Sequence, residues 1–360
     1  MKNLAKFLYR KYWICKVFLE IFFNFSNYHK EIKVPKVYYA GAIKGDFGGP
    51  YVKIKKLNNI FPEIKSKFNI IYVLSNSPNL SLRTINLIKK KNIPLILNQN
   101  GVFYPSWYKG NWKKQNLVMA NVYHSADYIL WQSSFCKKAS EKFLGRSFRK
   151  GEIIYNAVDT KKFSPKINTS SKFKLLITGN IKKNNSYRIT VVLQALKEII
   201  KINKSVHLFI AGYIEDFNGF SSQLESLKIR DFVTFLGPFD QSNAEKIYQI
   251  ADAYITMSYQ DNCPSAVIEA MSCGLPILYS ASGGIPELVG TNSGVGLDVP
   301  LDWEKIHTPK IEKIVEGFLK IYVDRKNMSD SARTRAVELF DIEKWYTRHL
   351  EIFENNMRNI

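Results

Sequence analysis

The chain has 360 residues, of which 46% are hydrophobic and 23% are charged. These values are typical of a globular protein with a core, and they exclude a disordered or low-complexity chain. The length is sufficient for about two domains. The four cysteines include no Cys-x-x-Cys pair, which argues against a zinc ribbon or a dense disulfide scaffold and favours a reducing, cytoplasmic compartment.

The net charge of +21 is concentrated in one half of the chain. Residues 1–165 contain 29 Lys and Arg against 8 Asp and Glu, whereas residues 166–360 contain 23 of each kind. This asymmetry indicates that the first half meets an anionic partner, such as a membrane surface, a nucleic acid or an acidic polymer. A solvated, lysine-rich surface is the plainer alternative.

The N-terminal segment, residues 1–33, is basic and aromatic. Its apolar run, Tyr12–Phe25, is interrupted by Lys16 and Glu20, so it is no clear transmembrane helix, and no small-residue cleavage site follows it. The mixture of aromatic residues and lysines suits a helix that lies in a membrane interface. A helix packed on the following domain, or an oligomer contact, remains the alternative.

The rest of the chain alternates strands with helices, which predicts two α/β domains with parallel sheets. In the first half we expect strands at 37–40, 70–74, 94–97, 128–131 and 153–155, and helices at 51–59, at 82–91 and before 126. In the second half we expect strands at 174–178, 207–211, 232–235 and 253–256, and helices at 189–202 and 244–250. The polar stretch 166–171 predicts the boundary, giving domains 34–165 and 166–340. Ligands of doubly wound sheets bind at the carboxyl ends of the strands, here in a cleft between the domains.

The most informative segment is 258–287. Pro264 is predicted at the first position of a helix, and Gly274 just beyond its end. The first N–H groups of that helix, at about Ser265 and Ala266, would be free and would lie at the positive end of the helix dipole. This arrangement is suited to a phosphate group.

Two carboxylates accompany this helix. Glu269 lies one turn beyond Ser265 on the same face, where it could accept hydrogen bonds from the vicinal hydroxyls of a ribose. Asp261 precedes the helix and could reach a second polyol. A phosphate, a ribose and a sugar together describe a nucleotide sugar. In the simpler interpretation, Asp261 only caps the helix and Glu269 is a surface residue.

The same segment resembles the signature of family 4 retaining glycosyltransferases, which have the two-domain GT-B fold. The resemblance rests on Asp261 and Glu269 with seven residues between them, and on the later sequences Gly274-Leu-Pro276 and Gly283-Gly-Ile-Pro-Glu287. It extends from about Val34 to the end of the chain. It also implies that the C-terminal helix, 341–360, crosses back to the first domain.

The resemblance implies which residues act. Asp261 and Glu269 would be the catalytic pair. Donor-binding roles would fall to Gly48, Gly49, Asn180, Lys182, Lys183, Arg188, Gly237, Asn262, Cys263, Pro264, Ser265, Ala266 and Glu269. Asn98 and Asn100 would lie on the acceptor side, in the region where many members carry a histidine.

The chain departs from the family pattern at the diphosphate site. Asn180 and Asn185 stand where the family usually has an Arg and a Lys, so Lys182, Lys183 or Arg188 would have to supply the positive charge. The first acidic residue, usually Glu, is Asp261. No general base can be assigned. The resemblance implies that the leaving diphosphate accepts the acceptor's proton on the same face of the sugar. Because the chain has no Asp-x-Asp pair, we expect neither a metal nor another cofactor.

These observations predict a retaining glycosyltransferase that uses a UDP- or GDP-sugar and a glycan or lipid-linked acceptor. We expect it to serve bacterial cell-envelope polysaccharide or lipopolysaccharide synthesis, peripheral on the inner face of the cytoplasmic membrane. The alternatives are a non-catalytic nucleotide-sugar-binding partner subunit and a sugar-nucleotide epimerase of the same fold. A nucleic-acid binder has no supporting motif, so no nucleic-acid partner is expected.

Overall fold

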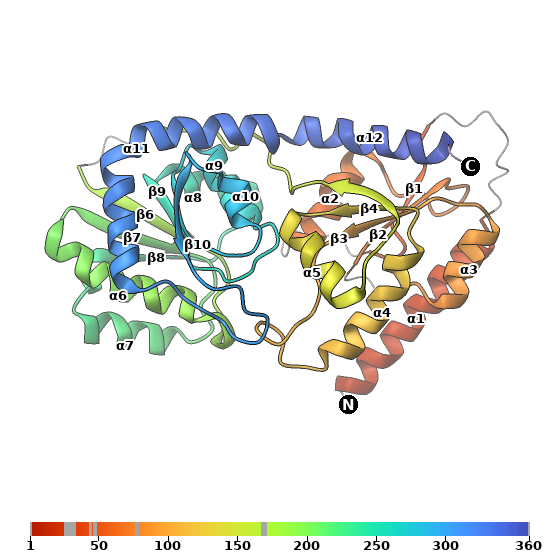
Figure 1. The fold of residues 1–360 in the computed structure, drawn as a ribbon, viewed down its shortest axis with the longest axis horizontal. Helices are drawn as coiled ribbons and strands as arrows, with labels where there is room; N and C mark the ends of the chain where they lie inside the picture. Colours follow the sequence, from red (N-terminus) through yellow and green to blue (C-terminus); the bar gives the residue numbers. More distant parts are fainter. Residues whose placement is uncertain are drawn as a thin grey trace. The chain divides into compact units, whose positions relative to one another are not determined.

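The computed structural model describes residues 2–24, 34–42, 45, 49–75, 79–166 and 171–358, with side chains described only from residue 8 to residue 357. Contacts within the chain divide it into two compact units. The first unit runs up to Tyr155 and resumes at Glu343, and the second unit is Asn156–Ile342. Figure 1 shows the helices and strands of both units.

The first unit contains a parallel five-stranded sheet in the order β1-β2-β3-β4-β5. Its strands are β1 (Val37–Tyr38), β2 (Ile70–Leu74), β3 (Leu95–Gln99), β4 (Tyr128–Trp131) and β5 (Lys150–Ile153). Every residue of β2 and β3 is buried, as expected for strands covered on both faces. The described strands follow one another in chain order, so this sheet shows no reversal of strand order.

Six helices accompany this sheet in the described part of the first unit. They are α1 (Lys2–Phe22), α2 (Gly49–Ile60), α3 (Leu82–Lys90), α4 (Trp112–Ser125), α5 (Ser134–Leu144) and α12 (Ile342–Arg358). Side chains of Ser81, Asn111 and Ser133 accept hydrogen bonds from the first turns of α3, α4 and α5, which fixes where these helices begin. Ring contacts place His349 and Phe353 of α12 against Tyr72 of β2, so the C-terminal helix packs within the first unit.

Helix α1 is anchored to the first unit. Just after the helix, Asn24 donates a hydrogen bond to the Phe68 carbonyl (2.9 Å) and accepts one from the Phe68 N–H (3.1 Å). Within the helix, Val17 and Ile21 are fully buried, and the Tyr38 hydroxyl donates to Glu20. One face of the N-terminal segment therefore packs on the domain, as one of the sequence-based alternatives holds.

The second unit contains a parallel six-stranded sheet in the order β11-β10-β9-β6-β7-β8. Its strands are β6 (Phe173–Thr178), β7 (Val206–Ala211), β8 (Val233–Gly237), β9 (Ala253–Thr256), β10 (Ile277–Ala281) and β11 (Gly294–Asp298). The chain starts in the middle at β6, adds β7 and β8 on one side, and then continues on the other side with β9. This is the doubly wound Rossmann order, with its reversal between β6 and β9.

Over its described residues, the second unit has six α-helices and three short 3₁₀ turns. They are η1 (Lys183–Asn185), α6 (Tyr187–Ile202), α7 (Phe217–Leu227), η2 (Arg230–Phe232), η3 (Gln241–Asn243), α8 (Ala244–Gln249), α9 (Ser265–Ser272), α10 (Ile285–Val289) and α11 (Ile311–Leu339). Helix α11 bends at Asp324, where the backbone is not helical. A single buried core unites the sheet with α6, α7 and α11, and includes Leu208, Ile255 and Phe318.

The structure differs from the sequence-based expectations in detail. A strand was expected at 153–155, but β5 ends at Ile153, so most of these residues lie after the strand. No helix was proposed for the ranges of α5, α7 or α11. The linker residues 156–165 lie in the second unit, where the Phe163 carbonyl accepts a hydrogen bond from Ser272 (2.6 Å). The boundary between the units in the sequence therefore lies after Tyr155, whereas the polar stretch after residue 165 predicts a later boundary.

Candidate nucleotide-sugar site

The reversal of strand order brings two predicted segments together. The residues after β6 lead to Asn180, and those after β9 lead to Asp261. Because β6 and β9 are hydrogen-bonded neighbours, both segments leave the same edge of the sheet. In sheets of this type, ligands bind outside the carboxyl ends of the strands at the reversal point.

Asp261 is held through its backbone. Its carbonyl accepts a hydrogen bond from the Gly284 N–H (2.8 Å), and a Cβ atom on Gly283 would lie 2.3 Å from the same carbonyl oxygen. Close contact with Asp261 therefore requires a glycine at position 283. The Asp261 Oδ1 atom accepts a bond from the Cys263 N–H (3.3 Å). Burial raises the pKa of Asp261, while the positive charge of Arg188 opposes that rise.

The segment between Asp261 and α9 leads into a helix N-terminus that has no side-chain cap. Pro264 is the N-cap residue, so its prediction as the first helical residue was wrong by one position. Val267 is the first residue of α9 whose N–H bonds back to Pro264 (3.1 Å), which leaves Ser265 and Ala266 in the open first turn. Gly274 has a φ of +73° just after the C-cap, as predicted.

Two neighbours complete this segment. The Cys263 carbonyl accepts a hydrogen bond from the Asn156 side chain (2.6 Å), which fixes the backbone before Pro264. The Oδ1 atom of Asn262 is buried and has no hydrogen-bond partner within the described part of the chain. A buried acceptor without a donor is costly, so a ligand or water donor at this point would stabilise the site.

Glu269 is a buried residue, with 7% of its surface exposed, and not the surface residue of the simpler interpretation. Its Oε1 atom accepts a hydrogen bond from Gln241 (2.9 Å), and its Oε2 atom accepts one from the Tyr248 hydroxyl (2.7 Å). These two bonds come from opposite oxygens and orient the carboxylate group.

Sequence reasoning missed the hydroxyl cluster behind Glu269. The Tyr248 hydroxyl lies 3.3 Å from Thr178 Oγ1, which lies 3.0 Å from the Tyr254 hydroxyl. These residues come from α8, β6 and β9, so only the tertiary fold brings them together. Burial raises the pKa of Tyr254 to about 12, and burial together with the Glu269 charge raises the pKa of Tyr248 well above its usual value of 10. Both tyrosines therefore keep their protons at neutral pH.

The candidate cations of the second unit are Lys182, Lys183 and Arg188. Of these, Arg188 is the one whose charge acts on Asp261. It lies in the first turn of α6 and contributes positive charge at both Asp261 and Tyr254. Its guanidinium carbon is 6.0 Å from the centre of the Tyr187 ring. Its Nε–H is buried without a hydrogen-bond partner in the described structure, so this donor is available to a ligand.

The other basic candidates lie elsewhere on the same loop. The Lys183 N–H donates to Glu215 (2.8 Å), and the Lys182 N–H donates to the Asn185 side chain (2.6 Å). Asn180 Oδ1 accepts a bond from the Tyr213 N–H (3.4 Å). Asn180 and Asn185 thus serve to shape this loop.

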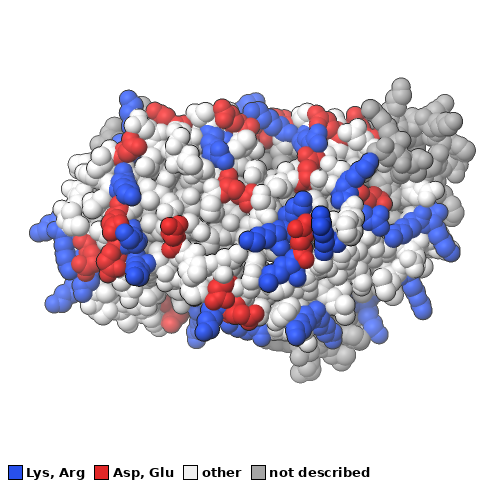
Figure 2. Space-filling model, viewed as in Figure 1, with Lys and Arg blue, Asp and Glu red and all other residues white. Residues whose placement is uncertain are grey.

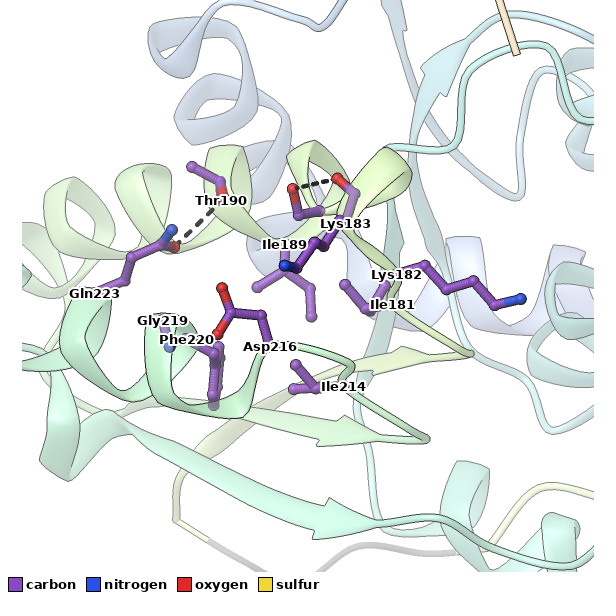
Figure 3. A pocket seen from close by; sticks show the side chains of 11 residues that line it. Ile181, Lys182, Lys183, Ile189, Thr190, Ile214, Asp216, Gly219, Phe220 and Gln223 are labelled. Carbon is purple, nitrogen blue, oxygen red and sulfur yellow. Dashed lines mark hydrogen bonds between the residues drawn. The ribbon is translucent and has the colours of Figure 1, made fainter. Parts of the chain in front are cut away.

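Lys182 and Lys183 border a small pocket of about 150 Å³ between α6 and α7. Figure 3 shows the Lys183 side chain on the side of Asp216, whereas Lys182 extends away from the other labelled residues. Ile181, Ile214 and Phe220 contribute apolar surface to its lining. Neither predicted catalytic carboxylate lines this pocket, which therefore differs from the site around Asp261.

Glycines follow or end three neighbouring strands at this edge of the sheet. Gly179 follows β6, Gly212 follows β7 and Gly237 ends β8, all with positive φ. A Cβ atom on Gly212 would lie 2.1 Å from the Gly179 carbonyl oxygen, so no larger residue fits there. Nothing lies within 4 Å of a Cβ atom placed on Gly237, the predicted donor-binding residue.

The predicted residues of the first unit lie at the ends of strands or helices. Gly48 is outside the described residues, and Gly49 is the first residue of α2. Asn98 belongs to β3, and its Oδ1 atom accepts a hydrogen bond from the buried Lys53 amino group (2.9 Å). That amino group also lies 3.3 Å from Asn100 Oδ1. Lys53 was missed, because nothing in the sequence distinguishes it from its exposed neighbours.

Two features are absent from the described residues. No three His, Cys, Asp or Glu side chains in the described ranges are grouped so that they could hold a metal ion. None of the helices described here is both long enough and apolar enough to cross a membrane.

The fold has many known counterparts. The Anabaena protein HepE, solved in complex with UDP, matches with a TM-score of 0.62 and 15% identity over 84% of this chain and 81% of its own. A glycosyltransferase from Rickettsia africae matches with a TM-score of 0.65 and 17% identity, over 88% and 85% of the two chains. Two parallel-sheet α/β domains of this kind define the GT-B class, so the expected fold class is confirmed.

Residues 159–335 match the family described as glycosyl transferases group 1. This match confirms the resemblance found in the sequence. Among curated relatives, the N-acetyl-alpha-D-glucosaminyl L-malate synthase of Bacillus anthracis is 26% identical over 58% of this chain and 52% of its own length. Spore coat protein SA of Bacillus subtilis is 23% identical over 58% and 59%. The matched region thus spans little more than half of these relatives.

Proposed function

We propose that the protein transfers a sugar from a nucleotide-sugar donor, UDP- or GDP-linked, to a glycan or lipid-linked acceptor. The observation that carries the proposal is the convergence of Asp261, Arg188 and Glu269 at the reversal point of the second sheet. The match to glycosyl transferases group 1 and the likeness to HepE, solved with UDP, support the same assignment.

Each group has a part in this proposal. The open first turn of α9 and Arg188 receive the diphosphate, because both offer positive charge. Glu269, oriented by Gln241 and Tyr248, accepts hydrogen bonds from the ribose. Asp261 contacts the donor sugar.

We propose retention of configuration and independence from a metal. With no general base assigned, the leaving phosphate accepts the acceptor's proton on the face that the acceptor attacks, while Arg188 and the α9 dipole stabilise the developing charge. The acceptor side falls to the first unit, around Asn98 and Asn100. A role in bacterial cell-envelope polysaccharide or lipopolysaccharide synthesis, on the inner face of the cytoplasmic membrane, fits the basic first unit.

The test is direct binding of UDP- and GDP-sugars to the full chain, followed by transfer to a panel of lipid-linked and soluble glycans. Micromolar binding of one donor series, with release of the nucleoside diphosphate only when an acceptor is present, supports the proposal. Release without any acceptor would indicate an epimerase. Binding with no release under any condition would indicate a partner subunit, an outcome to which Asn180 and Asn185 lend weight.

A further inference from the structure

The solvent-facing side of α1 is apolar. Leu8, Tyr12, Cys15, Leu19 and Phe22 recur at intervals of three and four residues, so they form one stripe along the helix, here called the outer stripe. Every one of them is exposed, Leu8 and Tyr12 by 56% and 58% and Leu19 and Phe22 by 50% and 48%. A surface helix normally exposes polar residues, so this stripe is an apolar face that no other described part of the chain covers.

Positive charge borders the outer stripe on both sides. At 100° per residue, Lys11 lies at one margin of the stripe and Lys16 at the other. The Lys16 amino group is 4.8 Å from the Trp13 ring centre, with its stem along the helix. Glu20, the sole acidic residue of α1, is engaged by the Tyr38 hydroxyl on the side that packs against the domain.

The same charge continues over the neighbouring helices. Helix α3 contacts α1, and α4 contacts α3, so the three lie side by side (Figure 1). Neither α3 nor α4 contains an acidic residue. Their exposed basic residues are Arg83, Lys89, Lys90, Lys113 and Lys114. We call α1, α3 and α4 together the basic helical face.

The net charge follows the division into units. The first unit has 30 Lys and Arg against 10 Asp and Glu, a net charge of +20, whereas the second has 22 against 21, a net charge of +1. Figure 2 shows the contrast on one side of the molecule, where Lys and Arg predominate over the first unit and both signs are mixed over the second.

We propose that the basic helical face docks on an anionic lipid bilayer, with the outer stripe of α1 lying in the interface. Aromatic and aliphatic side chains suit the boundary of headgroups and acyl chains, and the flanking lysines reach anionic headgroups while their stems stay apolar. A nucleic acid would match the charge but not the apolar stripe. The proposal deepens the proposed function by naming the surface on which a lipid-linked acceptor is reached, although docking itself needs no transfer activity.

The test uses the full chain and liposomes of phosphatidylcholine alone or with about one third phosphatidylglycerol. We expect co-sedimentation only with the anionic liposomes, and a steep loss of binding between about 50 and about 500 mM salt, because charges near a surface are screened within a Debye length of about 8 Å at physiological salt. Affinity for UDP- and GDP-sugars is measured on the same samples, so that a failure of docking is distinguished from a failure of donor binding.

Two sets of variants locate the surface. The double variant Leu8→Asp/Leu19→Asp should weaken liposome binding at least tenfold, whereas Val323→Asp/Leu339→Asp on α11, at residues 85% and 46% exposed, should leave it unchanged. The triple variant Lys11→Gln/Lys89→Gln/Lys90→Gln should weaken binding about fivefold per lysine. The exposed lysines of the second unit provide its control, Lys305→Gln/Lys320→Gln/Lys326→Gln.

Three results would overturn the proposal. The first is equal binding to neutral and anionic liposomes, or to neither. The second is loss of self-association in the Leu8→Asp/Leu19→Asp variant, measured by light scattering without lipid, which would assign the outer stripe to a second copy of the chain. The third is salt-sensitive binding to RNA or DNA that the triple lysine variant abolishes, together with no binding to liposomes.

Discussion

The Tyr248 hydroxyl donates a hydrogen bond to the Oε2 atom of Glu269 across 2.7 Å, and both side chains are buried. Because burial and the Glu269 charge raise the pKa of Tyr248 well above 10, this tyrosine keeps its proton and acts only as a donor. The bond therefore sets the orientation of the carboxylate before any ligand arrives.

Glu269→Gln should weaken binding of the free nucleoside diphosphate about 10- to 150-fold. The reason is the loss of a charged acceptor for ribose hydroxyls, worth about 1.5–3 kcal/mol. Titration calorimetry with UDP and GDP measures the change. The matched control is Glu198→Gln on α6, an exposed carboxylate paired with Lys201. Unchanged nucleotide affinity in Glu269→Gln would show that Glu269 does not contact the ribose.

Tyr248→Phe removes one donor from Glu269 while keeping the aromatic ring. We expect the free energy of unfolding to fall by about 1–3 kcal/mol, because a buried carboxylate oxygen loses its partner. Nucleotide affinity should fall less than in Glu269→Gln, since the Gln241 bond to the other oxygen remains. Urea unfolding and the same titrations check both values. A larger loss of affinity in Tyr248→Phe than in Glu269→Gln would refute an orienting role.

Asp261→Asn should lower turnover more than it lowers affinity for free UDP or GDP. The side chain precedes α9 and lies near Arg188, where we expect the donor sugar and not the ribose. Turnover is measured as release of the nucleoside diphosphate in the presence of acceptor. Similar losses of free-nucleotide affinity in Asp261→Asn and Glu269→Gln would mean that their roles are assigned wrongly.

Arg188→Gln should weaken binding of UDP or GDP about 10- to 150-fold, because it removes a charge-assisted hydrogen bond to phosphate. Lys182→Gln and Lys183→Gln, in the segment that precedes α6, serve as matched controls of equal charge change. Their effects should be smaller, since both lysines line the separate pocket between α6 and α7. If either lysine variant loses more affinity than Arg188→Gln, that lysine binds the diphosphate.

His349 should make the first unit sensitive to acid. Burial lowers its pKa to about 3, with the Lys53 charge contributing, whereas the unfolded chain has an ordinary histidine pKa of about 6.5. Between these values the unfolded state binds more protons, so this histidine lowers the free energy of unfolding as pH falls from 6.5 to 3, by up to about 1.4 kcal/mol per pH unit.

The measurement for His349 is urea unfolding at several pH values between about 4 and about 7. His349→Gln should flatten the dependence on pH, although it also loses stability at neutral pH because the ring contacts Tyr72 and Trp345. An identical slope in the wild type and the variant would show that His349 does not govern this dependence.

The local sequence pattern was sufficient to predict helix α9 and its approximate ends. Helix α9 is found where the sequence predicts a helix, between Pro264 and Gly274. The spacing of Asp261 and Glu269 agrees with this position. The error of one position at Pro264 arises because an N-cap and a first helical residue differ only in backbone angle, here a ψ of 116°.

Contacts between distant elements could not be predicted in this way. Tyr248 was placed on a helix, but its bond to Glu269 depends on how α8 packs against α9 and the end of β6. Lys53 has the sequence context of an exposed helix residue, yet it is buried beside Asn98. The alternating pattern specified the classes of the elements, whereas side-chain partners follow from the sheet order.

The three glycines at the ends of β6, β7 and β8 limit how this protein could be redesigned. Gly179 and Gly237 have open space where a side chain would be, and Gly212 admits no substitution. A molecule lying over these strand ends would form its hydrogen bonds with backbone peptide groups. A change of side chain does not alter these donors and acceptors. Selecting variants that prefer another nucleobase should therefore succeed by changing loop length, or by varying flanking residues such as Asn180 and Tyr213, and not by mutating the glycines.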